Sequence, residues 1–292
     1  MAARSEPQVA RLAWRARLAG LRARALAAAV FVPCFVVVAW RGGAYFVLLV
    51  NLLLVLGTLE LVRMQRAKQL DPDASLCHAA ALLLPWAVFA RNGELAEPAL
   101  LLLFIVAVAR VLWRGQVQGS MPRLAATIFA VLYVGWLGSY LVRLRELPLL
   151  FARAPFDGFR FVLLAFLFTW VSDTGAYFFG TLLGRRRLAP RVSPGKSVEG
   201  SLAALACTGA AGSVAGATFM ATLLVPWQGL VLGVVASAVG QLGDLLASLL
   251  KRDAAFKDAS QLIPGHGGVL DRFDSVLLVA PLLYYALRFF VL

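Results

Sequence analysis

Charged residues and cysteines are scarce in this sequence. Only 15% of its 292 residues are charged, whereas 61% are hydrophobic, and the mean hydropathy is +0.81. A soluble domain carries about 25% charged residues, so an ordinary soluble protein is excluded. The three cysteines lie far apart within apolar stretches. This placement suggests neither a disulfide framework nor a zinc site.

Acidic residues are few compared with basic ones. The chain has 15 Asp and Glu against 28 Lys and Arg, and its net charge is +13. In a membrane protein such an excess indicates contact with lipid headgroups and the orientation of the loops. Membrane lipids are therefore the expected partners of the basic residues, and no nucleic-acid partner is expected.

Long apolar stretches fill most of the sequence. Because a helix that spans a bilayer needs about 20 mostly apolar residues, the pattern predicts an all-α, polytopic integral membrane protein with about nine transmembrane helices. The predicted spans are residues 25–40, 44–62, 74–90, 98–113, 124–142, 161–184, 198–225, 229–250 and 275–292.

The distribution of basic residues predicts the orientation. With the N-terminus in the cytoplasm, most of the 28 Lys and Arg residues lie on the cytoplasmic side, as the positive-inside rule requires. This N-in, C-out arrangement places loops 185–197 and 251–274 on the cytoplasmic face. We divide the chain into a basic cytoplasmic or interfacial arm (1–24), N-terminal transmembrane helices (25–160) and a C-terminal transmembrane catalytic region (161–292).

The basic arm has two interpretations. It is either an amphipathic helix lying on anionic headgroups or an organellar transit peptide, which is also rich in Arg. A cleavable secretory signal is not expected, because no small-residue cleavage site follows the apolar run.

Polar residues within the spans differ between the two halves. In the N-terminal half, Asn51, Glu60 and His78 are interpreted as interfacial solvation or helix packing. In the C-terminal half, Asp173 and Asp244 lie inside predicted spans. A carboxylate in a membrane is costly and is by default functional, although a pairing with Lys or Arg that only holds helices together is the alternative.

Two charged segments flank the last spans. On a helix, Asp244, Ser248 and Lys251 fall on one face that leads toward the cytoplasmic end, which predicts a polar cavity open to the cytoplasm. Residues 251–274 then combine phosphate-binding cations, a glycine-rich turn and several carboxylates. Carboxylate oxygens without cysteine indicate a hard cation such as Mg²⁺ rather than Zn²⁺.

The segment 193–200, Ser-Pro-Gly-Lys-Ser-Val-Glu-Gly, invites a P-loop interpretation. We reject it because the first glycine of that motif would fall on Pro190 and no strand is expected before it. The segment instead predicts a turn that opens a helix, where free N–H groups favour a phosphate.

The C-terminal segment carries a long motif: Ser248, Lys251, Arg252, Lys257, Asp258, then Pro264-Gly-His-Gly-Gly268, then Asp271-Arg-Phe-Asp274. This motif resembles that of the phosphatidate cytidylyltransferases, also called CDP-diacylglycerol synthases. Segment 193–200 and Asp173 with Ala176 and Tyr177 resemble upstream elements of that family. The resemblance implies a homodimeric, all-helical membrane enzyme that transfers the cytidylyl group of CTP to phosphatidic acid, with Asp244 and Asp271 as metal ligands.

These observations together predict a set of site residues and partners. The expected catalytic residues are Asp244, Asp271, Lys251, Asp258 and His266, with His266 as an orienting donor rather than a base. The expected substrate-binding residues are Asp173, Ser193, Lys196, Ser197, Ser248, Arg252, Lys257, Gly267, Gly268, Arg272 and Asp274. The expected cofactor is Mg²⁺, with a second cation left open.

Two other functions stay open at this point. A CTP-dependent lipid or polyprenol kinase would use the same site but release CDP. A cation-coupled transporter would also carry carboxylates inside helices, although no internal repeat is evident. The expected location is a bacterial inner membrane with the active site facing the cytoplasm.

Overall fold

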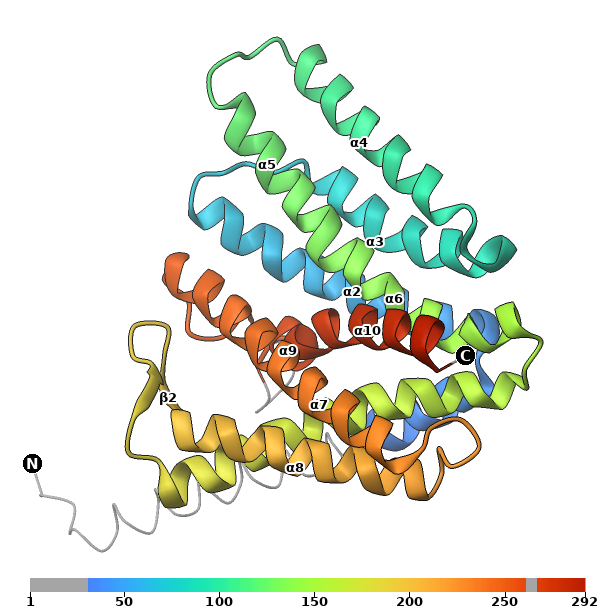
Figure 1. Ribbon diagram of the computed structural model, residues 1–292. Coiled ribbons are helices and arrows are strands. Elements are labelled where there is room, and N and C mark those ends of the chain that lie inside the picture. Colours follow the sequence, from blue (N-terminus) through green and yellow to red (C-terminus); the bar gives the residue numbers. More distant parts are fainter. Residues whose placement is uncertain (1–30, 261–266, 292) are drawn as a thin grey trace, which may run out of the picture.

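Apolar helices follow one another along the chain in this computed structural model, which describes residues 31–260 and 267–291 (Figure 1). After a helix over Phe31–Arg41 come α2 (Gly43–Ala67), α3 (Ala74–Phe89), the 3₁₀ turn η1 (Ala90–Gly93) and α4 (Ala96–Trp113). One long span then joins α5 (Ser120–Ala130), the π-helix η2 (Val131–Trp136), α6 (Leu137–Glu146) and the 3₁₀ turn η3 (Leu147–Phe151). The C-terminal part contains α7 (Pro155–Leu183), β1 (Arg187–Ala189), β2 (Ser193–Ser197), α8 (Val198–Ala217), α9 (Pro226–Asp253) and α10 (Leu270–Phe290).

The helices agree with the prediction of a polytopic membrane protein. Seven helices of the described chain are long and apolar enough to cross a membrane, and two shorter apolar helices, Phe31–Arg41 and Ala74–Phe89, fall on the two remaining predicted spans. The helical membrane architecture is thereby confirmed. The count of nine spans and the orientation stay predictions, and the arm 1–24 lies outside the described residues.

Several predicted boundaries are wrong. α8 ends at Ala217 rather than continuing to 225, and α10 begins at Leu270 rather than at 275. Consequently Asp271 and Asp274 lie in the first turns of a helix, not in a loop. Hydropathy misplaces such ends because charged residues can occupy the exposed turn of a helix as readily as a loop.

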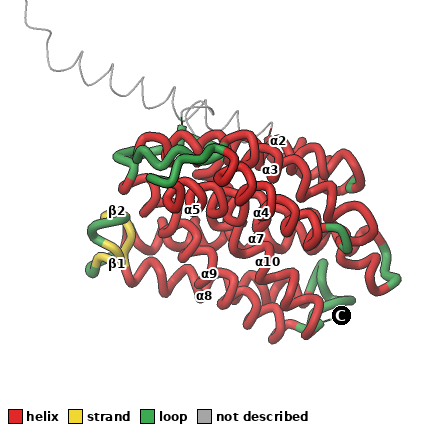
Figure 2. Tube along the Cα trace, turned by 90° about the horizontal axis from the view of Figure 1, so that it is seen from above, coloured by secondary structure: helices red, strands yellow, loops and turns green. Residues whose placement is uncertain are grey.

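A short hairpin is the exception to the all-helical pattern. β1 and β2 pair antiparallel, with Arg187 opposite Ser197, and Figure 2 shows the hairpin at one end of the layered helices. The expectation that no strand precedes Pro190 is therefore wrong, because β1 ends at Ala189. Strands this short carry too little alternation to be recognised in a sequence. Pro190 still occupies the position of the first P-loop glycine, so the rejection of that motif stands.

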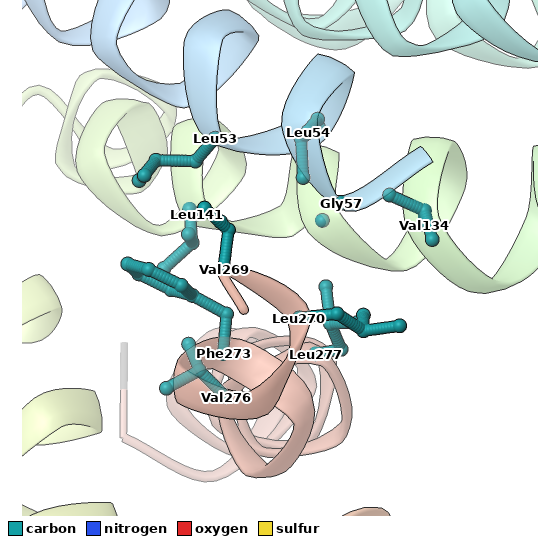
Figure 3. A pocket seen from close by; sticks show the side chains of 11 residues that line it. Leu53, Leu54, Gly57, Val134, Leu141, Val269, Leu270, Phe273, Val276 and Leu277 are labelled. Atoms are coloured by element: carbon teal, nitrogen blue, oxygen red, sulfur yellow. The ribbon is translucent and has the colours of Figure 1, made fainter. Parts of the chain in front are cut away.

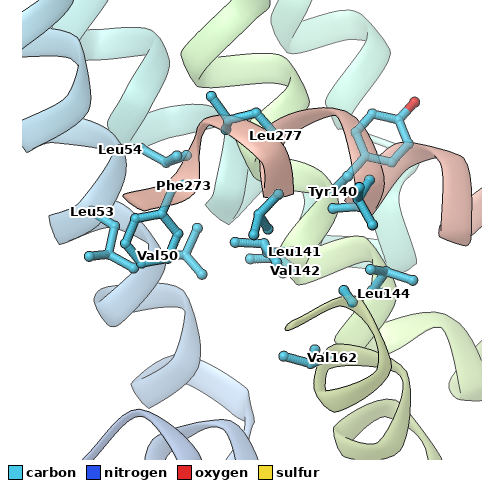
Figure 4. Close-up of a cluster of buried hydrophobic side chains, with 14 of the residues drawn as sticks. Val50, Leu53, Leu54, Tyr140, Leu141, Val142, Leu144, Val162, Phe273 and Leu277 are labelled. Atoms are coloured by element: carbon cyan, nitrogen blue, oxygen red, sulfur yellow. The ribbon is translucent and has the colours of Figure 1, made fainter. Parts of the chain in front are cut away.

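The main core lies where four helices meet (Figure 4). Val50 and Leu54 of α2, Leu144 of α6, Val162 of α7 and Leu277 of α10 are all buried there. α4 lies at the periphery, and only 17% of its most apolar stretch is buried. The core thus connects the N-terminal half of the chain directly with α10.

α8 packs closely between α7 and α9. A β-carbon on Gly212 of α8 would collide with the carbonyl oxygen of Gly229 of α9. Small residues permit this close backbone approach, which is how helices associate when lipid provides no hydrophobic driving force.

Asp73 caps α3. Its carboxylate accepts hydrogen bonds from the Leu76 N–H at 3.1 Å and the Ser75 hydroxyl at 2.7 Å, and it pairs with Arg110 at 3.0 Å. Burial acts to raise the pKa of Asp73, but these three partners outweigh it and hold the pKa below its ordinary value.

We expect Asp73→Ala to lower the free energy of unfolding by about 1 kcal/mol at neutral pH, because the helix loses its cap. A lowered carboxyl pKa stabilises the fold above the ordinary pKa, and this contribution is lost as the pH falls through the lowered pKa. The difference between variant and parent should therefore shrink in acid. Thermal unfolding in detergent micelles measures both effects. Asp71→Asn is the control, since its carboxylate is 57% exposed, exposed ion pairs contribute little, and asparagine tolerates the φ of +43° at this position.

Candidate active site

α9 presents a row of polar side chains along one face. Ser237 lies 2.8 Å from Ser172 of α7, and Gln241 accepts a hydrogen bond from Ser201 of α8. The Ser248 hydroxyl donates to Asp244 at 3.3 Å. The predicted polar face is therefore present and continues two turns deeper than expected. Its members, spaced by four and three residues, are Ser237, Gln241, Asp244, Ser248 and Lys251.

The hairpin places a lysine beside Asp244. Lys196 of β2 forms an ion pair with Asp244, and the two side chains are 22% and 28% exposed. The Arg252 Nε donates to the Val192 carbonyl at 3.4 Å, which holds the hairpin against the C-terminal end of α9. Segments 185–197 and 251–260 thus lie at the same end of the bundle, as predicted.

Both ends of the hairpin are anchored at the start of α8. The Ser197 hydroxyl caps this helix by accepting from the Gly200 N–H at 3.2 Å. Glu199 accepts from the backbone N–H groups of Arg185 at 3.0 Å and Arg186 at 3.2 Å. Ser197 is buried, so its hydroxyl acts here as a helix cap, and its predicted contact with substrate stays a prediction.

Asp271 forms the second lysine–aspartate pair. Lys251 Nζ lies 2.5 Å from its Oδ1 atom, and the N–H groups of Ala259 and Gly268 donate to its Oδ2 atom at 2.9 Å each. The carboxylate therefore ties the start of α10 to the end of α9 and to the segment between them. Gly267 has φ of +80°, a backbone conformation that favours glycine.

Two further aspartates interact with these pairs. The carboxylate of Asp173 in α7 interacts electrostatically with the charges of Asp244, Lys196 and Arg272. The charges of Asp244, Lys251 and Asp173 act on Asp274, which is buried in α10. Four elements, α7, β2, α9 and α10, thus contribute to one electrostatic group, whose members are Asp173, Lys196, Asp244, Lys251, Asp271, Arg272 and Asp274.

The remaining predicted residues lie at the edge of this group. Ser193 is half-buried in β2, whereas Arg252, Lys257 and Asp258 are exposed. Gly267 and Gly268 lie directly before α10, where a β-carbon on Gly267 would be 3.0 Å from Asp271 Oδ2. His266 lies outside the described residues, so its expected role stays a prediction.

Glu60 contacts this end of the bundle although it is not among the predicted site residues. It is only 4% exposed and accepts hydrogen bonds from the Val269 N–H at 2.9 Å and the Leu270 N–H at 2.7 Å. Of the two interpretations of Glu60, interfacial solvation is therefore wrong, whereas helix packing agrees with these contacts between α2 and the start of α10. In the sequence, the only indication of a special role for Glu60 is its position as a carboxylate within an apolar run. That position does not reveal a hydrogen-bond partner 209 residues away.

Asp244 and Asp271 are the expected magnesium ligands, and their metal site stays a prediction. Among the described residues, no three His, Cys, Asp or Glu side chains form a metal-binding cluster. Mg²⁺ commonly takes only one or two protein carboxylates, with water and substrate phosphates as its other ligands. Each of the two aspartates already pairs with an ammonium group, so positive charge is favourable at both positions.

The arrangement suits chemistry on phosphates. Lysine and arginine side chains bind phosphate oxygens, and this end of the bundle combines Lys196, Lys251, Arg252 and Arg272 with carboxylates for a cation. The electrostatic group defined above consists of lysine, arginine and aspartate side chains. Positioning and charge neutralisation of phosphate groups are what these lysines, arginines and carboxylates can provide.

Comparison with known proteins gives the family. The cytidylyltransferase family model matches residues 22–290. The chain is 33% identical over 266 residues to a phosphatidate cytidylyltransferase of Staphylococcus saprophyticus, a match that covers 90% of this chain and 97% of the relative. It is 35% identical over 272 residues to one of Synechocystis, covering 84% and 88%. The resemblance carried by the motif is confirmed and extends to the N-terminal half: the chain belongs to the cytidylyltransferase family.

Proposed function

We propose that this protein transfers the cytidylyl group of CTP to phosphatidic acid, forming CDP-diacylglycerol and pyrophosphate in phospholipid biosynthesis. The observation that carries the proposal is the pair of lysine–aspartate contacts, Lys196 with Asp244 and Lys251 with Asp271, at one end of a membrane-type helix bundle. Membership of the cytidylyltransferase family and the names of its relatives support it.

In this reaction a phosphate oxygen of phosphatidic acid attacks the α-phosphorus of CTP. The bond between the α-phosphorus and the oxygen that bridges it to the β-phosphorus breaks, and pyrophosphate leaves with that oxygen. Because the attacking oxygen is already anionic, alignment and charge neutralisation matter more than a general base. Lys196, Lys251 and the neighbouring arginines hold the two phosphate-bearing substrates near one another.

A magnesium ion is part of the proposal. Asp244 and Asp271 would hold it, and the ion supplies charge neutralisation of the phosphate oxygens when bound. Asp173 and Asp274 lie in the same electrostatic group, so a second cation is compatible with the charges present.

The membrane arrangement follows from the distribution of charge and helices. We infer that nine helices cross a bacterial inner membrane with the N-terminus inside, and that the active site faces the cytoplasm, where CTP is made. The positive-inside rule supports this orientation, and the two charged segments share one end of the bundle. A homodimer is inferred from the family resemblance alone.

Label placement in CTP tests the reaction. The purified protein in detergent micelles should transfer label from [α-³²P]CTP, but not from [γ-³²P]CTP, to phosphatidic acid, and EDTA should abolish the transfer. A CTP-dependent kinase would label the lipid from the γ position and release CDP, which would refute the proposal. If neither label enters lipid although the protein is folded, cation or substrate flux in proteoliposomes becomes the relevant measurement.

Lys251→Ala should raise the apparent KM for CTP or phosphatidic acid by about 10- to 150-fold, since a charge-assisted contact with phosphate contributes about 1.5–3 kcal/mol. Steady-state kinetics with each substrate varied in turn measures the change. A lower yield of membrane-inserted protein with unchanged kinetic constants would instead assign Lys251 to topology.

A further inference from the structure

Glu60 connects the N-terminal half of the chain to the segment that carries Asp271. It lies on α2, and among the described residues its carboxylate accepts from the N–H groups of Val269 and Leu270 and from the Ser260 hydroxyl, the last at 2.5 Å. These donors lie on both sides of residues 261–266. One buried carboxylate therefore fixes the two ends of the glycine-rich segment.

The start of α10 depends on this carboxylate. The first N–H groups of a helix have no partner within the helix, and a negative charge there is favourable. Val269 and Leu270 are buried, so solvent does not satisfy them. The contact between α2 and the start of α10 is otherwise apolar. Figure 3 shows Gly57, one turn before Glu60 on α2, facing Val269 and Leu270. The cavity that these residues line has a volume of about 10 Å³.

Glu60 also explains why position 268 is a glycine. A β-carbon on Gly268 would lie 2.7 Å from Glu60 Oε2 and 2.8 Å from Oε1, which is too close for any other residue without a shift. The Gly268 N–H meanwhile donates to Asp271. The N–H group of residue 268 thus donates to Asp271, whereas those of residues 269 and 270 donate to Glu60. A displacement of Glu60 would therefore also displace Asp271.

We propose that Glu60 is a positioning residue, which holds Asp271 beside Lys251 without touching substrate itself. The inference rests on the proposed function for its kinetic consequence, but its structural part is measurable without any activity. It assigns a role in the active site to the N-terminal half of the chain, which contributes none of the predicted site residues.

The test compares Glu60→Gln with Asn51→Leu. Glutamine keeps the size of the side chain but removes its charge and presents a donor to the backbone N–H groups. We expect kcat to fall by about 10- to 100-fold, as for other residues that orient a metal ligand, with little change in the KM for CTP. Hydrogen–deuterium exchange should become faster at Val269 and Leu270.

Asn51 is the matched control. It lies on the same helix, is also 4% exposed, and donates to backbone carbonyls of α3 at 2.8 and 3.0 Å, away from the site. Asn51→Leu should lower the thermal stability while kcat and the exchange of residues 269 and 270 stay at the parent values. An equal loss of kcat in both variants would overturn the proposal, because general destabilisation would then account for it.

Two other results would also overturn the positioning role. One is parent-like exchange at residues 269 and 270 in Glu60→Gln. The other is faster exchange there with an unchanged kcat, which would leave Glu60 as a structural anchor only. A parent protein without cytidylyl transfer would refute the proposed function instead, and this outcome is distinguishable because the exchange comparison does not use activity.

Discussion

Asp244→Asn should lower kcat on the order of 100- to 1,000-fold while the protein still inserts into membranes and purifies normally. Asparagine has the same shape but lacks the charge that pairs with Lys196 and that would hold a cation. Loss of one electrostatic contact in the transition state has an effect of this size. Transfer of label from [α-³²P]CTP to lipid, measured at several Mg²⁺ concentrations, gives both kcat and the metal requirement.

Asp253→Asn is the control for this prediction. Asp253 lies nine residues further along the same helix, is 63% exposed and pairs with Lys68 at 3.1 Å. Because an exposed ion pair contributes little, this variant should keep the parent kcat. Near-parent turnover in Asp244→Asn would eliminate Asp244 as a ligand of the metal and as part of the site.

Asp271→Asn should have a comparable effect on kcat and should also raise the Mg²⁺ concentration needed for half-maximal activity. The asparagine oxygen can still accept from the N–H groups of Ala259 and Gly268, but its amide group cannot pair with Lys251. The segment before α10 should therefore remain ordered while the charge is lost. Magnesium titration of initial rates, together with thermal unfolding, separates the two contributions.

The stability measurement decides how this result is interpreted. If Asp271→Asn unfolds at a much lower temperature than the parent and its remaining folded fraction has the parent kcat, Asp271 is a structural cap rather than a metal ligand. A parent-like melting temperature with a large loss of kcat supports the metal assignment.

The course of the helices was largely predictable from the sequence. Apolar stretches of about 20 residues fall on the observed helices, because the requirement to satisfy the backbone within lipid permits little else. The shared face of Asp244, Ser248 and Lys251 was predictable for a similar reason, since helical spacing is local. Helix ends were less predictable: α10 begins at Leu270, because a buried carboxylate from another helix stabilises its first turn.

The hairpin shows a different limit. Arg187 and Ser197 are opposite each other in two strands too short to carry an alternating pattern. Its place beside α9 depends on single contacts from Lys196 and Arg252, and no local feature of the sequence encodes these contacts.

The sequence by itself thus determined the membrane class, the helical spans, the polar face of α9 and the residue types suited to phosphate and magnesium. Only the tertiary structure decided which charges meet: Lys196 with Asp244, Lys251 with Asp271, and Glu60 with the start of α10. The physical reason is the range of each effect. Hydropathy and helical periodicity act between near neighbours in the chain. A carboxylate on α2 and an amide 210 residues later meet only because the helices that separate them in the sequence pack against one another.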